Sequence, residues 1–329
     1  MKQWRDELLS VLVESKEKYV SGEELAERFG FSRAAVWKKI SILRAEGYPI
    51  EAATNRGYRM LPKAHALEQQ ILAALEAQNL SGRFNVSVED TVSSTNQVAR
   101  EAGNRGEKEP GVFVAIRQTA GRGRRGRTWI SDTDRGLWFS LLLRPGVEPR
   151  AASSLTLLFG LCILKALQRI CNVPVGIKWP NDIISLQNGK KLCGILSETS
   201  MEDNLISYAV IGCGINVSQE TFPEEIQSVA TSLWLEGARI EKAELLTAVL
   251  MEASVRYPEY VKDPAHFLPE YRANCATLGH PVRIESGIRE EGLAMDISDA
   301  GDLIVKKADG TLIHCSSGEV SVRGMLGYM

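Results

Sequence analysis

The sequence predicts an α+β protein of several domains: an N-terminal winged helix-turn-helix, a central α/β domain with a mixed sheet, and a small C-terminal β-barrel. The chain has 329 residues, enough for two or three domains, with 44% hydrophobic and 24% charged residues, as in soluble globular proteins. Helical periodicity gives way to alternating strands and helices near residue 63, and to short strands near residue 277. We therefore place the domains at 1–63, 64–276 and 277–329.

The first two helices are marked by periodicity and capping. Trp4, Leu8 and Leu12 lie on one face of a helix that ends near residue 17. The second helix begins after Ser21, which with the glutamate three residues later forms a capping box, and it ends at Gly30. Both signals are local, so they define short, well-bounded helices.

A third helix starts at Ser32 and places Val36, Ile40 and Leu43 on its inner face. Two extended arms around an Asn-Arg-Gly turn follow at 48–60 and are typical of a wing. Residues 32–63 hold seven Lys and Arg against two Glu, which favours DNA over the alternative of a small protein-interaction domain. The predicted DNA contacts are Ser32, Arg33, Ala34, Trp37, Lys38, Ser41, Arg56 and Arg59.

A glycine- and arginine-rich loop is the strongest chemical signal in the chain. Residues 121–127 read G-R-G-R-R-G-R, are followed by Thr128 and Trp129, and contain no carboxylate. Glycine admits close approach to backbone N–H groups, and arginine forks match phosphate or carboxylate oxygens. A solvated basic patch is the alternative, but apolar runs at 112–116 and 136–143 anchor the loop between two strands. We expect it to be mobile when empty and ordered by an anion.

Four further motifs are ambiguous when taken one at a time. S-S-T-N-Q at 93–97 is typical of a helix cap, and K-W-P-N-D at 178–182 of a turn fixed by its proline. Two lysines precede a predicted strand in K-K-L-C-G-I-L-S-E at 190–198. The glycines of I-G-C-G-I-N at 211–216 would let a ligand pack against the backbone of another strand.

In this order, the five motifs resemble those of the bifunctional biotin-protein ligases that also act as biotin operon repressors. The resemblance implies an ATP-dependent, AMP-forming enzyme that makes biotinyl-5'-AMP. It then transfers biotin to a lysine in the carrier domain of acetyl-CoA carboxylase or another biotin-dependent carboxylase. It also implies an SH3-like C-terminal domain, operator DNA as a partner, and a homodimer that forms when the adenylate is bound and represses genes of biotin synthesis or transport.

The same resemblance implies the site residues. It assigns catalysis to Arg124, Lys178, Asp182 and Lys191, whose charges suit a reaction between two anions. Lys178 could stabilise charge at the α-phosphate. Two roles stay open for Asp182, holding Mg²⁺ or helping to deprotonate the carrier lysine. The implied biotin and ATP contacts are Ser94, Thr95, Asn96, Gln118, Gly121, Arg122, Arg124, Arg125, Arg127, Trp129, Lys191, Gly194, Gly212 and Asn216. Trp129 would stack on adenine.

Composition excludes several other classes of protein. The acidic start and the lack of a signal-like run predict a cytoplasmic protein, and the apolar stretch 155–167 is too short for a membrane span. Six cysteines without a C-x-x-C pair and four isolated histidines predict no structural metal held by the protein.

Two competing functions remain at this point. A lipoate ligase shares the catalytic logic, but that family lacks this arginine-rich loop and the DNA-binding head. A biotin-sensing repressor with an inactive ligase domain is disfavoured by Lys178, Asp182 and Lys191, all of which are present.

Overall fold

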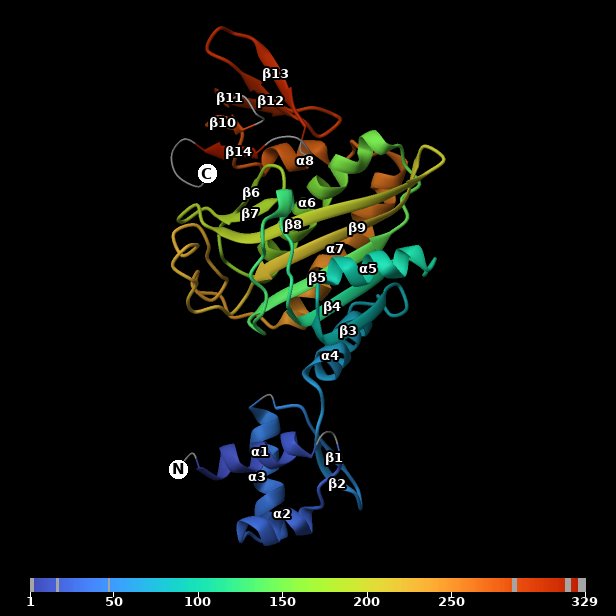
Figure 1. Cartoon of the computed structure of the whole chain (residues 1–329), viewed down its shortest axis with the longest axis vertical. Helices are drawn as coiled ribbons and strands as arrows, with labels where there is room; N and C mark the ends of the chain where they lie inside the picture. The colour runs from blue at the N-terminus through green and yellow to red at the C-terminus, as the bar shows by residue number, and fades with distance from the viewer. Residues whose placement is uncertain (1–2, 16–17, 47, 286–288, 317–320, 325–329) are drawn as a thin grey trace. The chain divides into compact units, whose positions relative to one another are not determined.

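The computed structural model describes residues 3–15, 18–46, 48–285, 289–316 and 321–324. It divides into two compact units, Met1–Gln69 and Gln70–Met329. Each unit is described by itself (Figure 1).

The N-terminal unit is a three-helix domain followed by a two-stranded antiparallel hairpin, as expected for a helix-turn-helix with a wing. Its elements are α1 Gln3–Glu14, α2 Gly22–Phe29, α3 Arg33–Ala45, β1 Ile50–Ala53 and β2 Gly57–Met60. Ser21 caps α2 by accepting from the Glu24 backbone N–H at 3.0 Å, and Gly30 ends it in the left-handed conformation at φ 64°. The predicted inner faces meet in one core that includes Leu8, Leu12 and the apolar face of α3.

A seven-stranded mixed sheet organises the second unit. The strand order is β3-β4-β5-β9-β8-β7-β6, in which only β3 and β4 pair in parallel. The strands are β3 Asn85–Val92, β4 Gly111–Gln118, β5 Gly136–Leu143, β6 Val175–Lys178, β7 Asp182–Ser185, β8 Lys191–Glu202 and β9 Leu205–Asn216. The interior strand β5 is buried along its whole length, which explains why its sequence is apolar except for Ser140.

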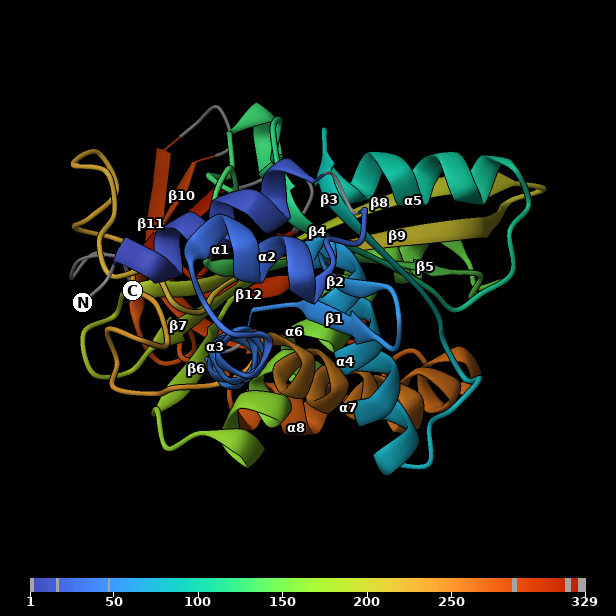
Figure 2. The same ribbon diagram turned by 90° about the horizontal axis from the view of Figure 1, so that it is seen from below.

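Helices cover both faces of this sheet. Figures 1 and 2 show α5 on one face and α6 with α7 on the other. The helices are α4 Lys63–Ala77, α5 Thr95–Asn104, α6 Ala152–Ile170, α7 Lys242–Lys262 and α8 Leu268–Ala273, with short 3₁₀ turns at Arg124–Gly126 and Pro149–Ala151. By length and composition α6 could cross a membrane, but 72% of its apolar window is buried inside the protein. It contains the apolar stretch 155–167, most of which is buried.

The C-terminal segment forms a second sheet, with strand order β13-β12-β11-β10-β14 and all neighbours antiparallel. Its strands are β10 Pro281–Glu285, β11 Arg289–Ile297, β12 Leu303–Lys306, β13 Leu312–Cys315 and β14 Ser321–Gly324. The sequence predicted short strands in this segment. Across the described residues the outer strands β13 and β14 do not pair with each other, so the structure shows an open sheet and the SH3-like barrel stays a prediction.

The C-terminal sheet is fastened to the central domain close to the K-W-P-N-D motif. The indole Nε1 of Trp179 donates to the Gly301 carbonyl at 3.1 Å, and the Trp179 backbone N–H donates to the Thr277 hydroxyl at 2.9 Å. Arg272 donates to the Ile297 carbonyl at 2.6 Å. These bonds give the hairpin that carries Lys178 and Asp182 a fixed support.

Candidate active site and nucleic-acid surface

The arginine-rich loop joins β4 and β5, as the sequence predicted, and lies over the face of the sheet that α5 covers. The Trp129 backbone N–H donates to the Gly121 carbonyl at 3.0 Å, and the Gly123 N–H donates to the Arg127 carbonyl at 2.7 Å. These bonds hold the two ends of the loop close together. Arg125 adopts φ 57°, a left-handed conformation that is uncommon for a residue other than glycine. The loop is therefore held at its base, and Arg122, Arg125 and Arg127 are exposed to solvent.

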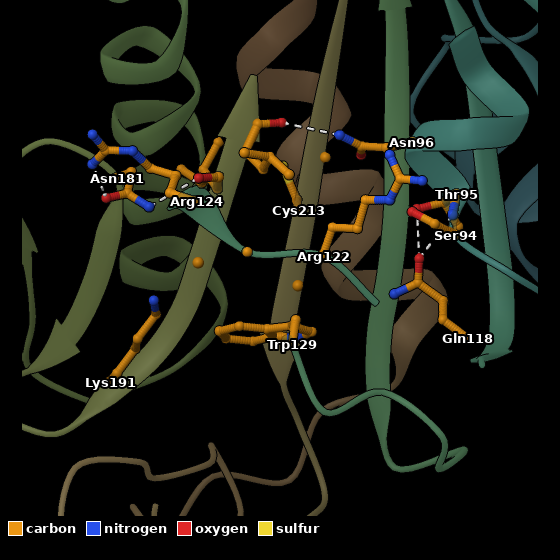
Figure 3. A pocket seen from close by; sticks show the side chains of 16 residues that line it. Ser94, Thr95, Asn96, Gln118, Arg122, Arg124, Trp129, Asn181, Lys191 and Cys213 are labelled. Atoms are coloured by element: carbon orange, nitrogen blue, oxygen red, sulfur yellow. Dashed lines mark hydrogen bonds between the residues drawn. The ribbon is translucent and has the colours of Figure 1, made fainter. Parts of the chain in front are cut away.

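Two adjoining cavities lie beneath and beside this loop, and Figure 3 shows the inner one. An inner one of about 50 Å³ reaches the start of α5, and an outer one of about 960 Å³ opens past Asp182 and Asn216. The outer cavity lies within the roughly 300–1,000 Å³ that is usual for small-molecule pockets, and the inner one is much smaller. The wall between the two is shared, and it consists of Gly123, Arg124, Trp129, Asn181 and Lys191.

Polar side chains line the inner cavity and hold one another in place. The Gln118 carboxamide oxygen accepts from the backbone N–H of Thr95 at 2.8 Å and from its hydroxyl at 3.2 Å, while the amide nitrogen donates to Ser131 at 3.0 Å. Ser94 occupies the N-cap position of α5, all of which the structure describes, but its side chain makes no capping hydrogen bond to that helix. The predicted capping role is therefore absent, and Ser94 is buried at the cavity wall instead.

Asn96 is oriented by two residues that sequence reasoning missed. The Ser140 hydroxyl donates to its Oδ1 at 2.7 Å, and its Nδ2 donates to Glu198 at 2.8 Å. Because an ionised carboxylate can only accept hydrogen bonds, the NH₂ end of the Asn96 amide faces Glu198 and its oxygen faces Ser140. No pattern in the sequence links these groups, because they lie on α5, β5 and β8.

Three glycines of β8 and β9 line the inner cavity, where a Cβ would collide with neighbouring side chains. A Cβ on Gly212 would lie 1.8 Å from Asn96 Oδ1, and one on Gly214 would lie 2.4 Å from the indole Nε1 of Trp129. A Cβ on Gly194 would meet the same indole at 2.9 Å. Trp129 therefore packs directly on bare backbone of β8 and β9.

Cationic and anionic groups converge on the outer cavity. Lys178 and Asp182 are cross-strand partners in the β6–β7 hairpin, and Lys191 Nζ lies 2.7 Å from Asp182 Oδ1. Both members of this ion pair are largely shielded from solvent, so their attraction is weakly screened. Lys178 is only 7% exposed.

Arg124 is less exposed than the other three arginines of the loop, and it lines both cavities. Its Nη1 donates to Asn181 Oδ1 at 2.9 Å, and burial lowers the pKa of its guanidinium from the ordinary value. Two buried donors at the shared wall, Arg124 Nη2 and Trp129 Nε1, have no hydrogen-bond partner within the described part of the chain. Unsatisfied buried donors are costly, so this wall is built to receive acceptor atoms of a ligand.

The structure brings nearly all of the predicted ligand contacts together. The inner cavity is lined by Ser94, Thr95, Asn96, Gln118, Arg122, Gly194 and Gly212. The outer cavity is lined by Arg125, Arg127, Lys178, Asp182 and Asn216. Gly121 lines neither cavity. It packs behind the loop, where a Cβ would lie 2.2 Å from the Ser131 hydroxyl.

In the N-terminal unit, the predicted DNA contacts on α3 form one exposed face. Arg33, Ala34, Trp37 and Lys38 are exposed, and Trp37 keeps 63% of its surface accessible. The Ser41 hydroxyl donates to the Trp37 carbonyl at 2.9 Å, and Ser32 caps the helix. A helix presents such a face to the major groove in helix-turn-helix proteins.

The two wing arginines are already engaged. The guanidinium carbons of Arg56 and Arg59 lie 4.2 and 4.8 Å from the ring centroid of Tyr19, and Arg59 forms an ion pair with Glu51. Their proposed contacts with phosphate would therefore compete with bonds within the domain.

Comparison with known protein families identifies three segments. Residues 88–216 match the Biotin/lipoate A/B protein ligase family, residues 5–59 match an HTH domain, and residues 277–323 match the Biotin protein ligase C terminal domain.

Individual proteins resemble nearly the whole chain. It is 35% identical over 313 residues to the bifunctional ligase/repressor BirA of Bacillus spizizenii, which covers 93% of this chain and 95% of that protein. It is 33% identical to the biotin--[acetyl-CoA-carboxylase] ligase of Mycobacterium tuberculosis, over 73% of this chain and 90% of that one. Among solved structures, the biotin protein ligase from Aquifex aeolicus in complex with biotin and ATP matches with a TM-score of 0.64 and 30% identity, covering 73% of this chain and 99% of that one.

Proposed function

Since the chain belongs to the family of bifunctional biotin-protein ligases and repressors, we propose that its two adjoining cavities hold biotin and ATP side by side. The protein is an ATP-dependent biotin-protein ligase. The wall shared by the two cavities supports this placement. At this wall, Arg124 and Trp129 each have a buried hydrogen-bond donor without a partner in the described part of the chain, between a polar inner cavity and a cationic outer one. The bicyclic head of biotin occupies the inner cavity, and the nucleotide occupies the outer one.

The first step joins two anions. The biotin carboxylate oxygen attacks the α-phosphorus of ATP, the bond between the α-phosphorus and its bridging oxygen breaks, and pyrophosphate leaves. Fixed cations must offset the repulsion between carboxylate and phosphate before this geometry can be reached. Arg124, Lys178 and Lys191 supply that charge from three different elements. Trp129 provides an aromatic face at the wall on which adenine can stack.

The second step transfers the acyl group. The amine of the carrier lysine attacks the carbonyl carbon of biotinyl-5'-AMP, AMP leaves, and the amine loses a proton. We assign the acceptance of that proton to Asp182, which lies at the outer cavity beside Lys191. The loop arginines shield the mixed anhydride from water until the amine arrives.

Magnesium would be held jointly by protein and nucleotide. No group of three or more His, Cys, Asp or Glu within the described ranges could bind a metal by itself. Asp182 and Asp132 both line the outer cavity, and Mg²⁺ commonly combines one or two carboxylates with phosphate oxygens. When bound, Mg²⁺ would neutralise phosphate charge.

Pyrophosphate release tests the ligase and its substrate together. The purified chain is mixed with ATP and either biotin or lipoate, and the release of pyrophosphate is followed. Release that requires biotin supports the proposal. Release that requires lipoate would identify a lipoate-ligase-like enzyme. If neither biotin nor lipoate causes pyrophosphate release, the chain would be a non-catalytic biotin sensor.

We further propose that the helix-turn-helix unit binds operator DNA and that two adenylate-bound copies bind together as a homodimer, repressing genes of biotin synthesis or transport. The exposed α3 face and the surplus of basic residues in 32–63 support DNA binding. Binding to duplex DNA should weaken steeply as salt rises, and Arg33→Ala with Lys38→Ala should reduce that slope. An affinity for DNA that does not change with salt concentration would contradict the proposed DNA binding. A molecular mass in solution that does not change when biotin and ATP are added would contradict the proposed dimer.

A further inference from the structure

The segment that follows Asn216 returns to the sheet and pairs with β8 at Lys191. The Lys191 backbone N–H donates to the Val229 carbonyl at 2.8 Å, and the Thr231 N–H donates to the Lys191 carbonyl at 2.9 Å. Residues 229–231 thus act as a short additional strand beside β8. The backbone of a residue that we place in the cationic site is held by this segment.

Asn216 is held by the same segment. Its Nδ2 donates to the Thr231 carbonyl at 2.9 Å, and its own carbonyl accepts from the Leu233 N–H at 3.1 Å. A carbonyl can only accept, so Thr231 holds the Nδ2 end of the Asn216 amide, while Gln219 Nε2 donates to its Oδ1 at 3.2 Å. Thr231 therefore joins the two residues of β8 and β9 that face the nucleotide.

Glu236 secures Thr231 to the β7–β8 turn. One carboxylate oxygen accepts from the Thr231 hydroxyl at 2.6 Å and from Asn188 Nδ2 at 2.8 Å, and the other accepts from the Ser185 hydroxyl at 2.6 Å. Burial alone would raise the pKa of Glu236, but these three bonds outweigh it and lower the pKa. The group is thus a carboxylate at neutral pH, and hydrogen bonds to a charged acceptor are stronger than neutral ones.

Glu236 lines neither cavity, so it acts through other residues. We propose that Glu236 is a positioning residue for the nucleotide half of the site: through Thr231 it holds Lys191 and Asn216 in the geometry that receives ATP. This inference rests on the proposed placement of ATP in the outer cavity. The biotin contacts Thr95, Gln118 and Asn96 belong to a separate hydrogen-bond network, so they should be unaffected.

The test compares Glu236→Gln with Glu224→Gln. Glu224 is an exposed residue between Asn216 and the paired segment, so the control makes the same chemical change at a nearby position. For each protein we would measure the KM for ATP at saturating biotin, the Kd for biotin without ATP, and the thermal midpoint. We expect Glu236→Gln to raise the KM for ATP about tenfold, equivalent to about 1.4 kcal/mol, with biotin affinity within about twofold of wild type and Glu224→Gln unchanged.

A second pair of variants locates the effect at Thr231. Thr231→Val removes the hydroxyl at nearly constant shape and should reproduce the rise in KM for ATP, whereas Thr231→Ser keeps the hydroxyl and should restore most of the affinity. In the double variant Glu236→Gln/Thr231→Val the two effects should not add, because they break one contact. If Glu236→Gln does not fold, the Thr231 pair gives the answer alone.

Two results would overturn the inference. One is a KM for ATP in Glu236→Gln equal to that of Glu224→Gln. The other is an equal loss of ATP and biotin binding together with a lowered thermal midpoint, which would indicate a purely structural role. Failure of the wild-type chain to release pyrophosphate with biotin and ATP would instead contradict the proposed function.

Discussion

Two glycines on β9 line the inner cavity next to residues that we assign to the biotin and nucleotide halves of the site, and each can be tested by adding one methyl group. A Cβ on Gly214 would lie 2.4 Å from the Trp129 indole, and ordinary contact begins near 3.4 Å, so the ring must retreat by about 1 Å. A Cβ on Gly212 would lie 1.8 Å from Asn96 Oδ1, which requires a shift of about 1.6 Å. Side chains next to a reacting centre tolerate such shifts poorly, with losses on the order of 100-fold.

The two substitutions should therefore damage different substrates. Gly214→Ala moves the predicted adenine platform, so we expect kcat/KM for ATP to fall about 100-fold. Gly212→Ala displaces Asn96, so we expect the main loss to be in biotin affinity. Overpacking should also destabilise each variant by about 1–3 kcal/mol. Pyrophosphate release with ATP and biotin varied in turn, together with thermal unfolding, measures all of these quantities.

Gly160 provides the matched control. It lies in α6, where a Cβ would meet its nearest neighbour at an ordinary 3.8 Å. Gly160→Ala should leave both substrates unaffected and stabilise the helix by about 0.5–1 kcal/mol. Wild-type kcat/KM for ATP in Gly214→Ala, or identical losses in both β9 variants, would refute the division of the site into two halves.

Three further predictions follow from the site and the core. Arg124→Ala should release the activated intermediate early, seen as faster loss of labelled biotinyl-AMP from the protein, and unchanged retention would contradict this. Asp182→Ala should slow transfer from preformed adenylate, and transfer at full rate would eliminate its role in deprotonation. Burial raises the pKa of Cys162 from 9.0 to about 12 and that of Cys315 to about 11. A group whose pKa is higher in the folded state stabilises the fold at pH values below its pKa in the unfolded state, and this stabilisation is lost as the pH rises toward the folded-state pKa. Unfolding free energy measured with urea should therefore decrease from pH 9 upward, and a rise over that range would be contrary to the reasoning.

Local signals predicted the N-terminal helices and hairpin and several strands of the central sheet. The capping serine Ser21 and the left-handed Gly30 determine α2 within ten residues, so neighbouring sequence is sufficient. The apolar runs on either side of the arginine loop likewise predicted β4 and β5. The mixed sheet is confirmed, whereas the closure of the C-terminal barrel depends on pairing between strands distant in sequence and stays a prediction.

The supporting residues of the site could not be predicted because their partners are far away in sequence. Asn96 and Glu198 are 102 residues apart, and Ser185 and Glu236 are 51 apart. Each is unremarkable among its neighbours, and only the packing of β8 against β9 and α5 brings the groups together. By contrast, Ser94 carried a strong local signal for a helix cap, and tertiary structure placed its side chain at the cavity instead.

The central claim is that this chain activates biotin with ATP and transfers it to a carrier lysine. Incubating a carboxylase carrier domain with the chain, ATP and biotin, and then measuring the intact mass of the carrier, tests it most directly. We expect the carrier to gain the mass of one biotinyl group on a single lysine, and this gain should require ATP and be lost when lipoate replaces biotin. A carrier of unchanged mass, under conditions in which the chain is folded and both substrates are bound, would contradict it.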